Sequence, residues 1–546
     1  MGNSSQKLPG IDSRAFFPLV AGVALLSLGL KACLIVRDVL PFNSDEAIVA
    51  LMARHILQGE RPIFFYGQAY MGSLDAILLA AGFKLFGQHV DVVRWIQAFL
   101  YAGTVVTTIC IGKILFQSRR IALIAGLLMA LPTVNTTLYT SVSLGGYGEA
   151  LLIGNLLIIL ALRIESHPKL GLLGLWGFLA GLGFWAFGLT AVYILPSGMF
   201  ILLALWRSKT ACSLAPRLLA LVGAALIGLS PILIWAGQNG FADIIREAFG
   251  SAIAGASPGS YGLDVLYHVY SFLLFGPTVI FGMRPPWGVQ WLAVPLLPFA
   301  MAFWLLVLMQ TGMHYLRQDD LSPGEWILLS ICLIVVLGFI LSPFGADPSG
   351  RYFIPLAIPL SIFAARVLKD IIFRQYGRVW MAFLLAGILI YNLLGIYSTA
   401  RNNPPGLTTQ FDAVARIDHS YDQALIDFLE QEDEQRGYSN YWVSYPLAFQ
   451  SEEEIIFIPR LPYHEDLRYT ERDDRYEPYQ ALVEDSQKAA YITTHHPVLD
   501  AQLRQGFEAA GLSWQERQIG DYHIFFELSS AITPEDIGIY ENEEQP

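Results

Sequence analysis

The sequence predicts a mainly α-helical protein that crosses a membrane many times and ends in a small α/β domain. Two observations predict the membrane part: 54% of the 546 residues are hydrophobic and only 15% are charged, whereas soluble proteins carry about 25% charged residues. The third observation is an uneven charge, because residues 401–546 hold 29 of the 46 acidic residues but only 10 of the 34 basic ones. A polytopic helical bundle is therefore expected to be followed by an acidic, hydrophilic region.

Apolar runs along residues 1–400 predict the individual spans, since a helix needs about 20 apolar residues to cross the hydrocarbon core. The first run continues to about Val36 without a small-residue cleavage site, so it is expected to be retained as a span. About 11 spans are expected. They lie near residues 15–36, 90–112, 120–138, 148–164, 170–187, 189–206, 217–236, 289–310, 326–342, 353–369 and 378–397.

The charge of the short connections predicts the orientation, because connections rich in Lys and Arg stay on the cytoplasmic side. The segment 265–283, broken by Gly276-Pro277, is interpreted as an interfacial or re-entrant piece, since a further span would move the last basic connection to the other side. The first loop, the loop around 237–288 and the residues after 398 then lie outside the cytoplasm. The basic connections are Lys113 to Arg120, Arg163 to Lys169, Arg207 to Arg217, and Lys369 to Arg378.

Two domains are predicted: a membrane domain at residues 1–400, with a first extracytoplasmic loop at about 37–89, and a soluble extracytoplasmic α/β domain at 401–546. A linker signature, Asn403-Pro404-Pro405-Gly406, separates them. The loop is expected to contain amphipathic helices, the second of which is too short to span and suits the interface plane. The expected elements are helices at 47–57, 74–86, 421–431 and 497–510, and strands at 440–445, 454–458, 489–493 and 522–527.

Two adjacent acids, Asp45 and Glu46, follow the first expected span. One interpretation is structural: Asn43 followed three residues later by Glu46 matches a capping box, and acids in a first turn complement the helix dipole. The other is functional, because neighbouring residues on a helix point about 100° apart. One acid can then face a site while the other serves the helix.

A second group of candidates is aromatic and hydrogen-bonding. Tyr and Trp favour membrane interfaces in any case, but an aromatic belt does not explain the polar residues between the tyrosines. Glu149 stands at the start of an otherwise apolar span, where an acid is costly and marks a functional site by default, the alternative being a headgroup-level acid at a helix N-terminus. The other members of this group are Tyr66, Gln68, Tyr70, Asp75 and Tyr147.

A third group is basic. Arg351, beside Tyr352, falls in a connection predicted to be extracytoplasmic, against the trend for basic residues. A guanidinium suits bidentate phosphate binding, although snorkelling to lipid headgroups is the alternative. Arg284 and Lys84 are further candidates. No GxxxxGKS loop, HExxH motif or paired-cysteine motif is present, which argues against a nucleotide-bound donor, and the acidic C-terminal region argues against nucleic acid.

Together these features resemble the GT-C superfamily of glycosyltransferases that use polyprenyl-phosphate sugars, in the branch of the protein O-mannosyltransferases and the lipid A aminoarabinose transferase. The resemblance covers roughly residues 10–400. No single motif is specific, but their order, side and spacing agree. The matching features are the acidic pair, the two loop helices, FYGQAYMGSLDA at 65–76, GGYGE at 145–149 and GRYFIP at 350–355.

The resemblance implies an inverting glycosyltransferase that transfers a hexose or pentose at the extracytoplasmic face of the bacterial cytoplasmic membrane. Asp45 would deprotonate the acceptor hydroxyl, with Glu46 and Glu149 as further catalytic candidates, and Glu149 would hold a sugar hydroxyl or, with Asp45, a divalent cation, Mg²⁺ or Mn²⁺. The donor phosphate would meet Arg351, Tyr352, Lys84 and Arg284. The sugar or acceptor would meet Tyr66, Gln68, Tyr70, Asp75 and Tyr147.

The implied partners are a polyprenyl-phosphate sugar, membrane lipids and a lipid, glycan or protein acceptor. The sequence departs from the family pattern in two ways. The C-terminal region is predicted to be α/β and not β-trefoil, which argues against a protein acceptor. The stretch GQAYMGSLDA differs from the Pro-rich stretch of the aminoarabinose enzymes, so their donor does not carry over to this sequence. The alternatives are a transporter or flippase of lipid-linked glycans, which would favour inverted repeats and charged helices near the midplane, and a glycan polymerase or ligase.

Overall fold

The computed structural model describes residues 13–207, 211–240, 242, 261–317, 321–347, 349–371 and 376–539. The chain forms two compact units. The membrane unit combines Met1–Arg37, Tyr70–Asp75 and Arg94–Thr399, and the C-terminal unit combines Asp38–Ala69, Ala76–Val93 and Ala400–Pro546. Most of the first loop, which the sequence analysis assigned to the membrane domain, therefore lies in the same compact unit as the acidic C-terminal region.

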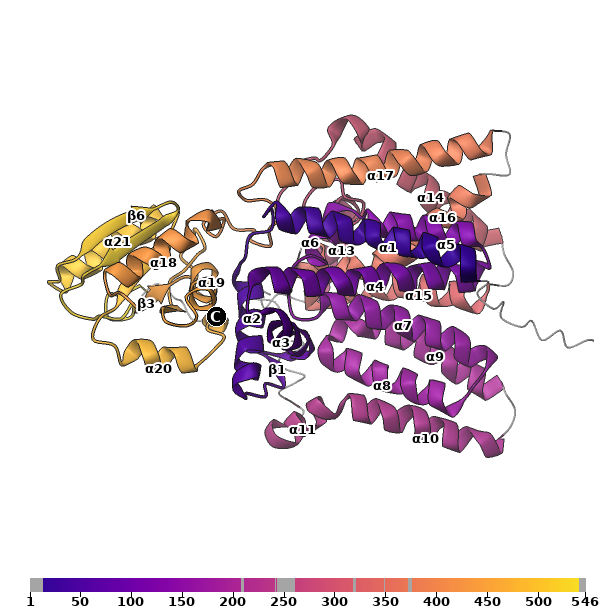
Figure 1. Ribbon diagram of the computed structural model, residues 1–546, viewed down its shortest axis with the longest axis horizontal. Helices are drawn as coiled ribbons and strands as arrows, with labels where there is room; N and C mark the ends of the chain where they lie inside the picture. The colour runs from indigo at the N-terminus through magenta and orange to yellow at the C-terminus, as the bar shows by residue number, and fades with distance from the viewer. Residues whose placement is uncertain are drawn as a thin grey trace, which may run out of the picture. The chain divides into compact units, whose positions relative to one another are not determined.

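Long apolar helices build the membrane unit and run side by side (Figure 1). Within the described ranges, nine helices are long and apolar enough to span a membrane, or ten if the bent pair α10 (Ala211–Gly228) and α11 (Ser230–Asn239) is one span. The nine comprise α1 (Ser13–Val36), α4 (Val90–Phe116), α7 (Tyr147–Ser166), α9 (Ala191–Arg207), α13 (Tyr261–Ile280), α14 (Leu297–Arg317), α15 (Pro323–Leu341), α16 (Ala357–Ile371) and α17 (Gly377–Arg401). A predicted polytopic helical bundle is thus confirmed.

Two of the expected spans and the segment expected to be interfacial differ from the structure. Residues 120–138 form two short helices, α5 (Arg119–Ala130) and α6 (Val134–Tyr139), because the residue before Pro132 is disfavoured in helical geometry. Residues 170–187 form α8 (Leu170–Ala186), which is shorter than the long spans. The segment expected to be interfacial lies in α13, a continuous helix of spanning length, since Pro277 falls only in its last turn.

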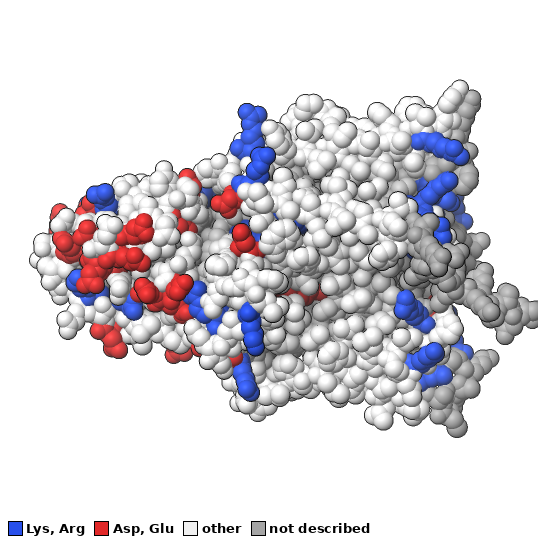
Figure 2. All heavy atoms as spheres, viewed as in Figure 1, with Lys and Arg blue, Asp and Glu red and all other residues white. Residues whose placement is uncertain are grey.

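Two helices form the centre of the membrane unit. One is α7, and the other is the segment Arg351–Ile371, which comprises the 3₁₀ turn η5 (Arg351–Leu356) and α16. In each of these two, 78% of the residues of the most apolar stretch are buried inside the protein. In α1, α13 and α14 the corresponding share is only 22%. Figure 2 shows one face of this unit, on which Lys and Arg gather near the two ends of the helices and the surface between them is largely uncharged. Both central segments begin with predicted site residues, Tyr147 and Glu149 in one and Arg351 and Tyr352 in the other.

The first loop contains α2 (Ser44–Gln58), a two-stranded sheet of β1 (Phe64–Phe65) and β2 (Gln68–Gly72), and α3 (Leu74–Phe86). The bounds of α3 are those predicted. Its outer face exposes large apolar side chains, including Leu85 at 74% and Phe86 at 71%. This exposed apolar face is the property expected of a helix that lies in a membrane interface.

The C-terminal region is the predicted α/β domain. Its five-stranded sheet has the order β4-β3-β5-β7-β6; β3 pairs in parallel with β4 and β5, and β7 pairs antiparallel with β5 and β6. Acidic side chains gather over this domain in Figure 2. The strands are β3 (Arg436–Ser439), β4 (Ile456–Pro459), β5 (Ala490–Thr494), β6 (Gln515–Ile519) and β7 (Tyr522–Phe526), and the helices are α18 (Asp422–Gln431), α19 (Tyr441–Gln450), α20 (Pro478–Glu484) and α21 (Pro497–Ala509).

One predicted strand of this domain is wrong. Residues 440–445 start helix α19, because the Asn440 side chain accepts a hydrogen bond from the backbone N–H of Trp442 at 3.0 Å and so caps a helix. The preceding residues already supply β3, which the sequence analysis did not predict. The aromatic run was mistaken for a strand because all its side chains are buried in the helix as well.

Candidate functional site

In the C-terminal unit, Asp45 lies in the first turn of α2 and is half-buried, whereas the neighbouring Glu46 is fully buried. The predicted capping box is wrong: the Asn43 side chain makes no capping bond to the helix. Its amide nitrogen instead donates to the Thr409 hydroxyl at 2.7 Å. The two acids therefore differ in exposure, and only Asp45 presents a carboxylate that solvent or a ligand can reach.

The partners of Asp45 come from the C-terminal region. The Tyr441 hydroxyl donates to one carboxylate oxygen at 2.8 Å, and the Thr409 hydroxyl lies 3.5 Å from the other. The Ser44 hydroxyl donates to the backbone oxygen of Tyr441. Tyr441 starts α19, which packs against α2. The start of α2 is thus tied to α19 by both the side chain and the backbone of one tyrosine.

A second carboxyl group lies near Asp45. Asp473 ends the 3₁₀ turn η7 (Glu471–Asp473) and is 7% exposed. Burial raises the pKa of Asp473 to about 7, with the charge of Asp45 adding to the rise and Arg475 opposing it. The guanidinium of Arg475 lies 5.6 Å from the centroid of the Tyr441 ring. The surroundings of Asp45 are therefore polar, charged and sensitive to protonation.

In the membrane unit, Asp75 and Glu149 form a buried pair, each 2% exposed. Asp75 accepts hydrogen bonds from the Gln97 amide at 3.0 Å, the Ser143 hydroxyl at 2.6 Å and the backbone N–H of Gly145 at 3.2 Å. Burial raises the pKa of Asp75, and these donors and the contact with Glu149 counter the rise. Since two neighbouring buried carboxyl groups cannot both ionise cheaply, the state of lowest cost keeps only one of them charged.

Glu149 differs from Asp75 in its donors. Both carboxyl oxygens of Glu149 are buried and receive no hydrogen bond from the described residues. Because a buried carboxyl group without donors is costly, this acid fits a ligand with hydroxyl groups or a cation. Among the described residues, no three His, Cys, Asp or Glu side chains are grouped as a metal site. A divalent cation at Glu149 or Asp45 therefore stays a prediction.

Arg351 stands at the start of η5 with a cluster of tyrosines. Its guanidinium pairs with Asp347 at 2.5 Å and lies 5.1 Å from the centroid of the Tyr352 ring. Tyr139 and Tyr147 also interact electrostatically with it. The turn before Arg351 requires Gly350, whose φ is +79° and where a Cβ atom would approach Val279 to 2.3 Å. The Arg351 guanidinium and several tyrosine hydroxyl groups are thus held together before any ligand binds.

The remaining predicted residues are placed differently. Tyr70 interacts with Tyr352 and so joins the Arg351 cluster. Arg284 donates to the Thr278 hydroxyl in the last turn of α13 and to the backbone oxygens of Pro285 and Gly288, which ties its loop to the end of this helix.

Tyr66 donates to Glu60 at 2.7 Å and contacts His55 at 2.9 Å, inside a network that joins α2 to the C-terminal region. That network also includes Glu453, which pairs with His55, and Tyr476, which donates to Glu60. Lys84 lies on the exposed face of α3, and Gln68 is half-buried in β2. The network favours a structural role for Tyr66.

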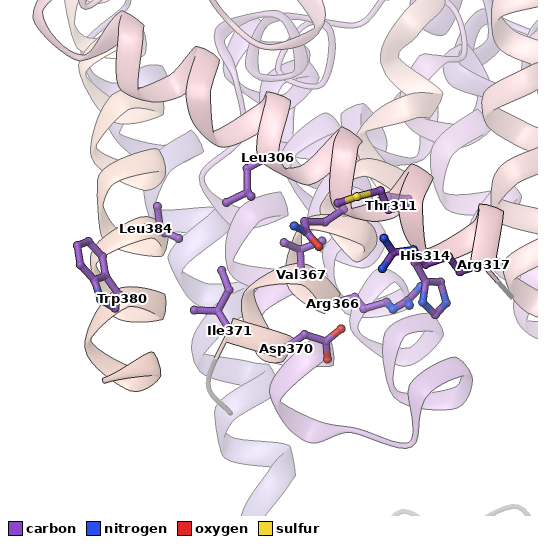
Figure 3. A pocket seen from close by; sticks show the side chains of 12 residues that line it. Leu306, Thr311, His314, Arg317, Arg366, Val367, Asp370, Ile371, Trp380 and Leu384 are labelled. Atoms are coloured by element: carbon purple, nitrogen blue, oxygen red, sulfur yellow. The ribbon is translucent and has the colours of Figure 1, made fainter. Parts of the chain in front are cut away.

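One cavity of the membrane unit contains none of the predicted residues. It measures about 720 Å³ and lies between α14, α16 and α17. Figure 3 shows His314, Arg317 and Arg366 gathered at one end, with Trp380 and Leu384 at the other. Arg366 is already paired with Glu325 at 3.2 Å. The cavity is amphipathic, and it does not share its lining with the residues around Asp45, Glu149 or Arg351.

Sequence reasoning missed the residues that the C-terminal region supplies. Thr409, Tyr441, Asp473 and Arg475 surround Asp45, yet none stood out from its local pattern. One signal was available: residues 468–479, RYTERDDRYEPY, combine four acids, three arginines and three tyrosines in one short stretch.

Comparisons with known proteins support the fold. No family profile and no curated protein matches the chain. The crystal structure of ArnT from Cupriavidus metallidurans bound to undecaprenyl phosphate matches with 13% identity and a TM-score of 0.54, covering 93% of this chain and 97% of ArnT. Its apo state matches over the same shares with 13% identity and a TM-score of 0.56.

A looser match, with a TM-score of 0.49 and 13% identity, is the oligosaccharyltransferase AglB from Archaeoglobus fulgidus in complex with an inhibitory peptide and a dolichol-phosphate; it covers 87% of this chain and 69% of AglB. The ArnT matches confirm the predicted GT-C fold. At 13% identity they establish the fold alone, and the function has to be argued from the residues.

Proposed function

We propose that this protein is an inverting glycosyltransferase that moves one sugar from a polyprenyl phosphate to a hydroxyl group of a lipid or cell-surface glycan. The observation that carries the proposal is Asp45, a half-buried carboxylate at the start of a loop helix with hydroxyl donors around it. Such a group can accept the proton of an acceptor hydroxyl within hydrogen-bond reach. The GT-C fold supports this reading by analogy.

In the proposed reaction the acceptor O–H proton passes to the Asp45 carboxylate as the acceptor oxygen attacks the anomeric carbon. The bond between this carbon and the phosphate oxygen breaks, and its electron pair leaves with the polyprenyl phosphate. Attack opposite the leaving group inverts the anomeric configuration. The oxygen, proton and charge are thereby accounted for without an oxidant or a nucleotide.

The leaving phosphate needs cationic and hydrogen-bonding partners that are in place before the reaction. Arg351 supports this role because Tyr352, Tyr147 and Tyr139 surround its guanidinium. Asp347 is the counterion of Arg351, so a bound phosphate would share the guanidinium with this carboxylate. ArnT, with the same fold, has a structure with undecaprenyl phosphate bound, which makes this lipid the first donor carrier to test.

Glu149 and Asp75 are proposed to hold the donor sugar. The donors around Asp75 favour its ionised form, while the two oxygens of Glu149 receive no hydrogen bond from the residues described. Sugar hydroxyl groups would supply them. Mg²⁺ or Mn²⁺ would suit the same oxygens and, when bound, would neutralise charge near the leaving group.

The proposed location is the bacterial cytoplasmic membrane, with the site and the C-terminal domain outside the cytoplasm. The Lys and Arg residues of the short connections support placing those connections on the cytoplasmic side. The acidic α/β domain, which differs from a β-trefoil, supports a lipid or glycan acceptor over a protein.

The proposal is tested with purified protein in lipid nanodiscs. A panel of undecaprenyl-phosphate sugars is added together with extracted envelope lipids, and release of undecaprenyl phosphate and the mass of the product are measured. We expect release with at least one donor, a product one sugar heavier, and loss of both in Asp45→Asn. Asp91→Asn, which changes an exposed acid in the first turn of α4, should retain both.

Three results would contradict the proposal. Near-normal release in Asp45→Asn would remove the proposed base. A product heavier by a block of sugars would instead indicate a polymerase or ligase. Accumulation of a lipid-linked glycan across proteoliposomes without release of lipid phosphate would indicate a flippase.

A further inference from the structure

The C-terminal domain reaches the carboxylate that the proposed function uses as its base. Tyr441, 396 positions along the chain from Asp45, donates its hydroxyl hydrogen to a carboxylate oxygen at 2.8 Å. The other oxygen faces the Thr409 hydroxyl at 3.5 Å, the limit of a hydrogen bond. One oxygen is therefore firmly held, and the second has only a weak partner that an acceptor hydroxyl can replace.

Tyr441 is itself held from several directions. Its backbone oxygen accepts from Ser44, and its side chain is 4% exposed. Asn440 caps α19 and donates to the Thr494 hydroxyl at 2.9 Å, which anchors the start of the helix to β5. Arg475 lies against the ring. The Tyr441 hydroxyl is thus held in a fixed position, and its hydrogen bond fixes the orientation of the Asp45 carboxylate.

A fixed carboxylate matters for general-base catalysis, because proton transfer requires the acceptor hydroxyl, the base and the anomeric carbon to be aligned. A free aspartate side chain rotates about its last bond and presents either oxygen. The Tyr441 hydrogen bond selects one rotation and leaves the second oxygen for the acceptor.

We infer that the C-terminal domain completes the active site, with Tyr441 as the positioning residue that orients the Asp45 carboxylate. This inference rests on the proposed function, in which Asp45 is the base. It assigns the domain a part in the chemistry, where the sequence suggested only an appended soluble extension.

The same contact has a purely structural explanation, namely that it docks the domain on the loop. Docking is secured elsewhere, however. Glu453 pairs with His55 at 2.9 Å and with Arg54 at 3.5 Å, and Arg54 also donates to the backbone oxygen of Phe449 at 3.0 Å. Tyr476 donates to Glu60 at 2.7 Å. Removing one hydroxyl group from Tyr441 should therefore leave the domain in place.

The test compares Tyr441→Phe with Tyr522→Phe. Tyr522 is a matched control, because it is also a buried tyrosine of the C-terminal domain whose hydroxyl donates to an aspartate, in this case Asp422. Steady-state kcat and the KM of each substrate are measured for the full-length protein in nanodiscs.

We expect Tyr441→Phe to lower kcat about 10-fold to 100-fold with the donor KM within about twofold of the wild type. Tyr522→Phe should keep the wild-type kcat and donor KM.

An unchanged kcat in Tyr441→Phe would overturn the inference, as would equal losses of kcat in both variants. A failure of the proposed function is seen separately, because Asp45→Asn would then remain active whatever Tyr441→Phe does.

Discussion

The two compact units carry acids in opposite settings. Asp45 in the C-terminal unit is half-buried and faces hydroxyl donors and charged groups, whereas Asp75 and Glu149 in the membrane unit are buried against each other. An accessible carboxylate with one weakly hydrogen-bonded oxygen suits proton transfer. A buried pair in which, among the described residues, one carboxyl group has several hydrogen-bond donors and the other has none suits the binding of a ligand. Exposure and donors, more than the identity of the residue, separate the two proposed roles.

The largest expected effect concerns the cation of the membrane unit. Arg351→Ala should lower kcat/KM for the donor about 100-fold to 1000-fold, because a preorganised partner of the leaving phosphate is lost. The measurement is the initial rate of undecaprenyl phosphate release. Asp347→Ala is the matched control, since it breaks the same ion pair but keeps the guanidinium. Equal losses in both variants would show that the pair serves only the structure.

The next effect concerns the buried pair. Asp75→Ala should lower the free energy of unfolding by about 3 kcal/mol, because three donors that it satisfies are left buried, each at about 1 kcal/mol or more. Ser143→Ala removes one of these bonds and should cost about 1 kcal/mol. Denaturant unfolding in mixed micelles measures both, and a stability of Asp75→Ala equal to the wild type would show that the pair is hydrated.

The smallest effect is a pH dependence from Asp473. Burial raises the pKa of Asp473 to about 7 from an ordinary value of 3.8, so the folded state favours the protonated form. Its contribution is present at low pH and is lost as pH rises through 7. Between pH 6 and pH 8 the free energy of unfolding should fall by about 1.4 kcal/mol on this account. The groups that face it are Arg475, Asp45, Arg472, Tyr463, Tyr441, Tyr445 and Tyr469.

Asp473→Asn checks this prediction, because it removes the titration while keeping the size of the side chain. The variant should show a flatter dependence of stability on pH over the same interval. A dependence equal to that of the wild type would assign the slope to other groups, and Asp466→Asn, an exposed acid of the same domain, controls for general charge.

Local sequence patterns predicted the helix bounds that depend on neighbouring residues. The bounds of α3 follow from an apolar run between polar turns, and α18 begins one residue after the predicted helix start. The start of α19 was misread because its buried aromatic residues carry no period that separates helix from strand. The prediction of a capping box was wrong because the Asn43 side chain donates its hydrogen bond to Thr409, a partner 366 positions away.

The site was predicted in parts and not as a whole. Asp75 and Glu149 were both singled out, but their contact joins positions 74 residues apart, which no spacing in the sequence encodes. Tyr441 and Asp473 were not singled out, since their meaning comes only from their nearness to Asp45. Contacts between distant segments arise from tertiary packing, and single-sequence patterns do not report them.

The central claim is that Asp45 performs the transfer while Arg351 holds the donor. The direct measurement is the binding of undecaprenyl phosphate to wild type, Asp45→Asn and Arg351→Ala, alongside their rates of transfer. We predict that Asp45→Asn binds the lipid with the wild-type Kd but does not transfer, and that Arg351→Ala binds at least about tenfold more weakly, equivalent to about 1.4 kcal/mol. Transfer by Asp45→Asn at the wild-type rate, or an unchanged Kd in Arg351→Ala, would contradict the account.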